Sequence, residues 1–188
     1  MNLASTYNLG RILKDEGIVI AKRDFSDADR IFVIFTRSRG KASFIAKGVR
    51  KPKSRKRGLL ETGNVITFAY ADSRSIPIIT EVELIKSHAG LRKSLTKISV
   101  AYFLCESVGR VTEEHEQNGA VYELLLNTFQ NLENTTKLKS LRYKFINNLL
   151  VAQGFWPAGR QLLEPDMAIE AVVERKLWSL RVGKRLQR

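Results

Sequence analysis

The sequence lacks the features that several classes of protein require. It has one cysteine, Cys105, and two histidines, His88 and His115, which lie 27 residues apart. A single cysteine forms no internal disulfide, and distant histidines without a cysteine pair have no metal-ligand spacing. The longest uncharged apolar run, around residues 100–105, is far shorter than the roughly 20 residues that cross a bilayer. We therefore expect no disulfide framework, no metal site and no membrane span.

Motifs for catalysis are missing as well. The sequence has neither Gly-x-Gly-x-x-Gly nor Gly-Lys-Ser/Thr, so it predicts no phosphate-cradling loop for a nucleotide or dinucleotide. Three glutamates, Glu113, Glu114 and Glu116, fall in a polar link between two predicted helices, where a solvated turn is the simplest interpretation. Cys105 lies on an apolar helical stripe, where a cysteine acts as a small hydrophobe. We expect a protein that is not an enzyme and uses no cofactor.

Acidic residues are absent from one long stretch, residues 30–60. The chain has 32 Lys and Arg residues against 19 Asp and Glu, and eleven of the basic residues lie in this stretch. The other 157 residues therefore hold 21 basic and 19 acidic side chains, which almost cancel. Charge concentrated on one segment indicates contact with a polyanion, and nucleic acid is the first candidate. The eleven residues are Arg30, Arg37, Arg39, Lys41, Lys47, Arg50, Lys51, Lys53, Arg55, Lys56 and Arg57.

Other interpretations of the basic stretch are a merely solvated loop or, in a eukaryote, a nuclear-import signal at residues 51–57. An ordinary solvated loop mixes the two signs of charge, which this one does not. Binding to an anionic membrane is disfavoured, because Gly40, Gly48, Pro52 and Gly58 prevent an amphipathic helix. The N-terminus has no basic start, apolar stretch and small-residue cleavage site, so we expect a cytosolic protein.

Patterns of period two predict five short strands in the first half, at residues 17–22, 31–36, 42–49, 64–71 and 78–85. Residues 50–58 form a solvated loop between the third and fourth strands, because Pro52 lacks an amide donor and six side chains are cationic. The loop lengths predict antiparallel pairing throughout. Five such strands fit a small closed barrel of the oligonucleotide-binding (OB) type.

Beyond residue 86 the apolar period changes from two to 3.6. Stripes at residues 98–108, 121–132 and 138–152 predict three amphipathic helices, of which the third ends at Gly154, three residues before Pro157. A further helix is expected at residues 166–180. The fold class is therefore an N-terminal five-stranded OB-fold barrel followed by an all-α helical domain. The predicted parts are an N-terminal arm (1–15), a nucleic-acid-binding barrel (16–87) and the helical domain (88–188).

On a barrel of this type, phosphates follow a cationic groove and bases stack on exposed aromatic rings. The predicted stacking residues are Phe44 and Tyr70. For Phe44, which lies between Ala42 and Ala46 on its strand face, packing in the core is the alternative. The predicted DNA-binding cations are Arg37, Arg39, Lys41, Lys47, Arg50, Lys51, Lys53, Arg55, Lys56 and Arg57.

Two long runs resemble the RecO family of bacterial recombination mediators: DEGIVIAKRDFSDADRIFVIFT at residues 15–36 and RGKASFIAKGVRKPKSR at residues 39–55. Weaker similarity extends to PIITEVELIKSH and LLVAQGFWP. The resemblance implies a nucleoid-associated protein that binds single- and double-stranded DNA and anneals complementary strands. It also implies that, with RecR, the protein helps load RecA onto DNA coated by single-stranded DNA-binding protein (SSB), and that its helical domain binds the acidic C-terminal tail of SSB.

The resemblance assigns DNA contact most directly to Lys47, Arg50, Lys51, Lys53 and Arg55. The sequence also departs from the family. Many members follow the Gly-aromatic-x-Pro element with a four-cysteine zinc module, and no cysteine follows residues 155–157 here, so we expect no zinc. The chain continues for 31 residues after Pro157, which is short for the family.

Two other functions remain open from the sequence. An RNA-binding barrel protein associated with ribosomes would have the same charge pattern, and only contacts to the 2′-hydroxyl would distinguish it. A nuclease is the alternative of a different class. It requires clustered carboxylates for metal ions, and the basic stretch contains none.

Overall fold

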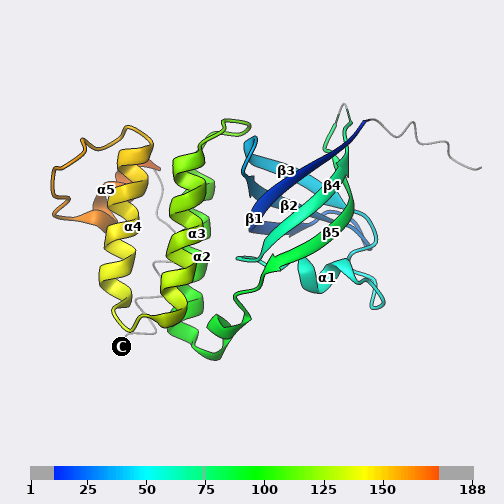
Figure 1. The fold of residues 1–188 in the computed structure, drawn as a ribbon, viewed down its shortest axis with the longest axis horizontal. Helices are drawn as coiled ribbons and strands as arrows, with labels where there is room; N and C mark the ends of the chain where they lie inside the picture. The colour runs from blue at the N-terminus through cyan, green and yellow to red at the C-terminus, as the bar shows by residue number, and fades with distance from the viewer. Residues whose placement is uncertain (1–10, 74, 174–188) are drawn as a thin grey trace, which may run out of the picture.

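The computed structural model describes residues 11–73 and 75–173, in which a five-stranded barrel precedes a layer of helices (Figure 1). The strands are β1 (Ile12–Asp24), β2 (Arg30–Thr36), β3 (Gly40–Ala46), β4 (Val65–Ala71) and β5 (Ile78–Lys86). The helices are the one-turn α1 (Lys56–Leu59), the 3-10 helix η1 (Ala89–Lys93), α2 (Leu95–Val111), α3 (Gly119–Asn134), α4 (Leu138–Ala152) and α5 (Pro165–Val172).

The sheet is a closed barrel with the strand order β1-β2-β3-β5-β4, which confirms the predicted architecture. The long strand β1 pairs with both β2 and β4, so that Gly17 lies opposite Thr36 on one side and Ile66 on the other. The barrel closes between β3 and β5, where Ile45 pairs with Ile78 in parallel. The prediction of antiparallel pairing throughout is wrong at this closure, because loop lengths report only on strands that follow each other in the chain.

The barrel interior is filled by alternate residues of its strands. In β4, the buried side chains of Ile66, Phe68 and Tyr70 belong to the interior cluster, as the period-two pattern requires. Phe44 of β3 contacts two of them, with ring centroids 4.9 Å from Phe68 and 5.0 Å from Tyr70. Both pairs are edge-on, the arrangement that aromatic rings prefer.

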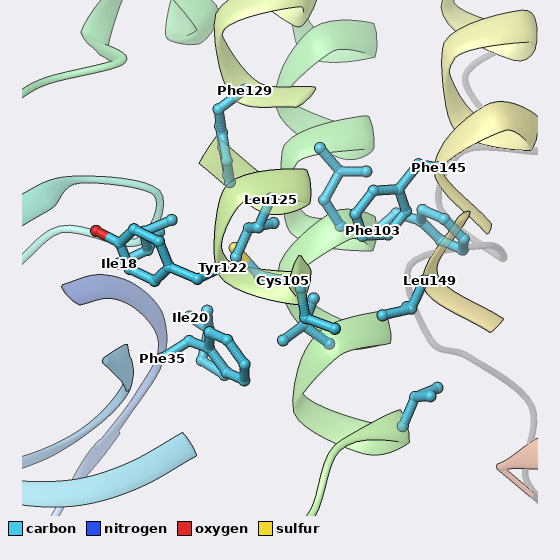
Figure 2. Packing of buried hydrophobic residues seen from close by; sticks show 14 of the residues in the cluster. Ile18, Ile20, Phe35, Phe103, Cys105, Tyr122, Leu125, Phe129, Phe145 and Leu149 are labelled. Atoms are coloured by element: carbon cyan, nitrogen blue, oxygen red, sulfur yellow. The ribbon is translucent and has the colours of Figure 1, made fainter. Parts of the chain in front are cut away.

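A second core joins the outer face of the barrel to the helices. Ile18, Ile20 and Phe35 are buried outside the barrel and belong to the same cluster as the apolar stripes of α2, α3 and α4. Figure 2 shows these barrel side chains facing the helical residues Tyr122 and Leu125. The helices therefore cover one side of the barrel, with α4 and α5 beyond α2 and α3 (Figure 1).

Local signals account for the helix ends. The side chains of Ser94 and Asn118 accept hydrogen bonds from the backbone amides of Lys97 and Val121, which caps the N-termini of α2 and α3. Gly154 takes a φ of 74° just after α4, as predicted for its terminating residue. The three predicted amphipathic helices are confirmed.

The predicted boundaries differ at both ends of the chain. β1 begins at Ile12, so residues 12–15 belong to the first strand and not to an arm, and residues 1–10 lie outside the described residues. Of the helix predicted at 166–180, the structure describes α5, and residues 174–180 lie outside the described part. The exact division of the chain into domains stays a prediction.

Gly40 provides a test of how the barrel and the helices fit together. Its φ is 66°, and a Cβ atom there would overlap the backbone carbonyl of Glu116 in the α2–α3 link. We expect Gly40→Ala to lower the free energy of unfolding by about 2–4 kcal/mol, because left-handed strain and the overlap add. Urea unfolding followed by circular dichroism measures this change.

The matched control is Gly119→Ala, at a helical glycine whose added Cβ would meet nothing within 4 Å. This control should be neutral or slightly stabilising, because alanine favours the helix. A Gly40→Ala protein as stable as the wild type would contradict the packing described here.

Candidate nucleic-acid interface

The basic loop, which we define as residues 47–59, connects β3 to β4 and includes α1. Both ends of the loop are attached to the barrel. Val49, near its start, and Leu60, which follows its last residue, are each 1% exposed and belong to the interior cluster. Between them the backbone follows turns, in which the amide of Lys51 donates to the Gly48 carbonyl and that of Ser54 to the Lys51 carbonyl. In Figure 1 α1 lies against the barrel, on the side away from α4 and α5.

Four cations of the basic loop are exposed and have no partner within residues 11–73 and 75–173. The side chains of Lys51, Lys53, Arg55 and Arg57 make no hydrogen bond or ion pair with any other residue that the structure describes. Neighbouring positive charges without partners repel each other, and a polyanion relieves that repulsion. We call these four residues the free cations.

Four other predicted cations already have partners within the protein. Arg50 donates to the Ser26 carbonyl at 2.7 Å and pairs with Asp24 at 3.4 Å. Lys56 donates to the carbonyl of Ile79 at 3.1 Å, and burial lowers its pKa. Arg39 donates to the hydroxyl of Tyr70, and Lys47 is exposed but not without contacts. Because these side chains already have partners within the protein, they are less available to phosphate than the cations without partners.

Lys41, one of the predicted DNA-binding cations, has contacts within the protein. Its ammonium donates to the carbonyls of Gly109, at 2.8 Å, and Thr112, which lie at the C-terminal end of α2. Burial lowers its pKa, while Glu114 and Glu113 in the following link oppose the shift. The ammonium caps the carbonyls that end the helix, and contact between Lys41 and phosphate stays a prediction.

Arg37 also lies at the junction between barrel and helices. Its guanidinium pairs with Glu16 at 3.1 Å and Glu123 at 3.0 Å and lies 4.6 Å from the ring centroid of Tyr122. The Tyr122 hydroxyl donates to Glu16 at 2.8 Å, and burial raises the pKa of Tyr122. Contact between Arg37 and DNA stays a prediction. It would require the guanidinium to bind a phosphate as well as Glu16 and Glu123.

Phe44 and Tyr70 cannot stack on bases in this structure. They are 0% and 2% exposed and pack against each other inside the barrel. Stacking needs a free ring face. The prediction is therefore wrong for both residues, and the core alternative for Phe44 is confirmed. Sequence reasoning missed Phe25, a residue that is 57% exposed in the β1–β2 turn beside the basic loop. The signal that could have identified Phe25 in the sequence was an aromatic residue within an otherwise polar turn.

Cys105 is buried, and burial raises the pKa of its thiol to about 12, as expected for a small hydrophobe. Across residues 11–73 and 75–173, no cluster of three or more His, Cys, Asp or Glu side chains could hold a metal ion. No helix in these ranges is long and apolar enough to cross a membrane.

Comparison with protein families agrees with the two structural halves. The family model described as "Recombination protein O N terminal" matches residues 11–88, which contain the barrel. The model described as "Recombination protein O C terminal" matches residues 92–161, which contain α2, α3 and α4. The chain belongs to the RecO family. The family resemblance found in the sequence is thereby confirmed.

Curated RecO relatives are similar over much of the chain. The DNA repair protein RecO of Dehalococcoides mccartyi is 32% identical over 79% of this chain and 58% of its own length. That of Symbiobacterium thermophilum is 34% identical over 59% of this chain and 44% of its own length. The RecO protein of Pelodictyon phaeoclathratiforme is 30% identical over 89% of this chain and 67% of its own length. The chain thus spans about half the length of the first two RecO proteins.

Replacing Lys41 tests its role at the junction. In Lys41→Met the carbonyls of Gly109 and Thr112 lose the donor that they share. We expect the free energy of unfolding to fall by about 1–3 kcal/mol, the usual consequence of leaving buried acceptors unsatisfied. The control, Lys53→Met at a free cation, should change it by less than about 0.5 kcal/mol. Equal stability of the two variants in urea unfolding would refute this role for Lys41.

Proposed function

We propose that this chain binds single- and double-stranded DNA through the basic loop and anneals complementary strands. The observation that carries this proposal is the set of free cations, Lys51, Lys53, Arg55 and Arg57, on a loop anchored to a barrel. Neutralising phosphates releases condensed counterions, which supplies affinity that does not depend on sequence. Contacts of this kind position the backbone and leave base edges free to pair.

Annealing requires two strands of like charge to approach each other. A dense cationic surface reduces their repulsion, and this step needs no nucleotide hydrolysis. The lack of a phosphate-cradling motif in the sequence supports an ATP-independent reaction. The further role, to assist with RecR in loading RecA onto SSB-coated DNA, rests on family membership.

We further propose that the acidic C-terminal tail of SSB binds in a groove between α3 and α4. The groove has a volume of about 670 Å³, and its lining combines the apolar side chains of Leu124, Leu141 and Phe145 with amide and hydroxyl side chains. The cations Lys137 and Lys144 are exposed at the same groove, and its lining includes no carboxylate. An acidic peptide that ends in an apolar residue needs this combination of charge and apolar surface.

Salt dependence tests DNA binding by the basic loop. Log K falls against log salt with a slope of about −0.7 per phosphate contact for single strands. Replacing the four free cations together by Gln should therefore flatten the slope by up to about 3, and should slow annealing. Fluorescence anisotropy with labelled oligonucleotides at several salt concentrations measures the slope.

The matched control removes four exposed cations of the helical part, in a variant with Lys93, Lys137, Lys139 and Lys144 replaced by Gln. This control changes the net charge by the same amount as the loop variant. It should keep most of the wild-type slope of log K against log salt. If the two variants lose the same slope, the basic loop is not the DNA-binding surface. Preference for RNA over DNA of the same sequence would favour the RNA-binding alternative.

A peptide titration tests the groove. The probe is an acidic peptide with a C-terminal apolar residue, and its control carries the same residues with the apolar one moved inward. Replacing both Lys137 and Lys144 by Gln should weaken binding of the probe by about 5- to 30-fold, while replacing Lys51 and Lys53 should have little effect. Unchanged binding in the Lys137 and Lys144 variant would place the peptide elsewhere.

A further inference from the structure

The turn between β1 and β2, residues 25–29, presents an aromatic ring to solvent. Phe25 is 57% exposed, although an apolar ring of this size is normally covered. A single exposed hydrophobic residue needs no explanation by itself. What distinguishes Phe25 is its position, because this turn is attached to the basic loop.

Three hydrogen bonds attach the turn to the start of the basic loop. The Gly48 amide donates to the Asp29 carboxylate at 2.8 Å. The amide of Arg50 donates to the Ala28 carbonyl at 3.0 Å, and its guanidinium donates to the Ser26 carbonyl at 2.7 Å. The turn that carries Phe25 is therefore fixed against the start of the loop, where Lys51, the first free cation, follows Arg50 directly.

The turn is also held from within. The Phe25 amide donates to the Asp29 carbonyl at 3.2 Å, and the Asp29 amide donates to the Ser26 hydroxyl at 3.2 Å. Just before the turn, the Asp24 carboxylate accepts a hydrogen bond from Arg30 at 2.8 Å, which lowers its pKa. A ring on a fixed turn loses little conformational entropy on binding, so its exposed area is available for contact.

The carboxylates around the ring also matter. Asp24 is paired with Arg30 and Arg50, and Asp29 accepts from Gly48, whereas Asp27 is exposed and has no partner among the described residues. An unpaired carboxylate repels phosphate, so the DNA backbone should pass over the free cations and not over Asp27. The turn is thus suited to a base, and the neighbouring free cations are suited to the backbone.

We propose that Phe25 is the residue on which a base of single-stranded DNA stacks, while the basic loop holds the adjoining phosphates. This proposal rests on the DNA binding proposed above. It adds that the protein prefers DNA with unpaired bases. In a duplex each base already stacks on its neighbours, so the ring adds little to duplex binding. Every base has a π face, so the contact tolerates any sequence.

The first experiment compares Phe25→Ala with Phe155→Ala, which removes an aromatic ring of similar exposure, 52%, beyond α4. Phe25→Ala should lower the affinity for a single-stranded oligonucleotide by about 5- to 150-fold, the range measured for loss of one stacking ring. Its salt slope should stay that of the wild type, because no cation is lost. Duplex affinity should change less than about twofold, and Phe25→Trp should restore single-strand affinity.

A second measurement locates the base. Oligonucleotides that contain 5-iododeoxyuridine cross-link on irradiation to an aromatic ring that stacks on the halogenated base. Trypsin cleaves after Arg23 and Arg30, so the adduct should appear in the peptide of residues 24–30. Finding the adduct only in other peptides would overturn the proposal.

The DNA affinities of these variants distinguish the stacking proposal from the proposal that the basic loop binds DNA. If Phe25→Ala binds like the wild type, while replacing the free cations weakens binding, only the stacking proposal is wrong. Equal losses on single strands and duplex would show a structural role for the ring and would also overturn it. If the wild-type protein binds no DNA, both proposals fail.

Discussion

The apolar contact between the outer face of β1 and β2 and helices α2 and α3 is the interaction on which the rest of the structure depends. Ile18, Ile20 and Phe35 would otherwise expose apolar surface outside the barrel. Burying each of them contributes roughly 1.5–3 kcal/mol. Because the helices occupy this side, the basic loop is left open on the side away from α4 and α5.

The same junction divides the basic residues into two groups. Lys41 and Arg37, near the β2–β3 turn, hold the helical part through carbonyls and carboxylates. The free cations on the basic loop have no such partners among the described residues. A cation next to a helix end or a carboxylate is stabilised within the protein, whereas a cation on a solvated loop remains available for an external anion.

Much of the fold was predictable from local patterns. Alternation in residues such as Ile66, Phe68 and Tyr70 identified β4, and Gly154 with Pro157 located the end of α4. The parallel contact between Ile45 and Ile78 was not predictable, because it joins strands that are not consecutive. The candidate site was predicted only in outline. Period-two alternation places a residue on one of two faces but does not say which face is interior, so Phe44 was open to two interpretations.

The sequence by itself determined that one segment carries the excess charge, that a barrel precedes helices, and which family the chain belongs to, since composition, period and ordered matches are local properties. Only the tertiary structure decided which cations are free, because pairing depends on groups far apart in the chain, such as Lys41 and Gly109. It also decided that Phe25, and neither Phe44 nor Tyr70, presents a ring to solvent. Exposure is a property of the closed barrel, because a side chain becomes buried only when strands distant in sequence surround it.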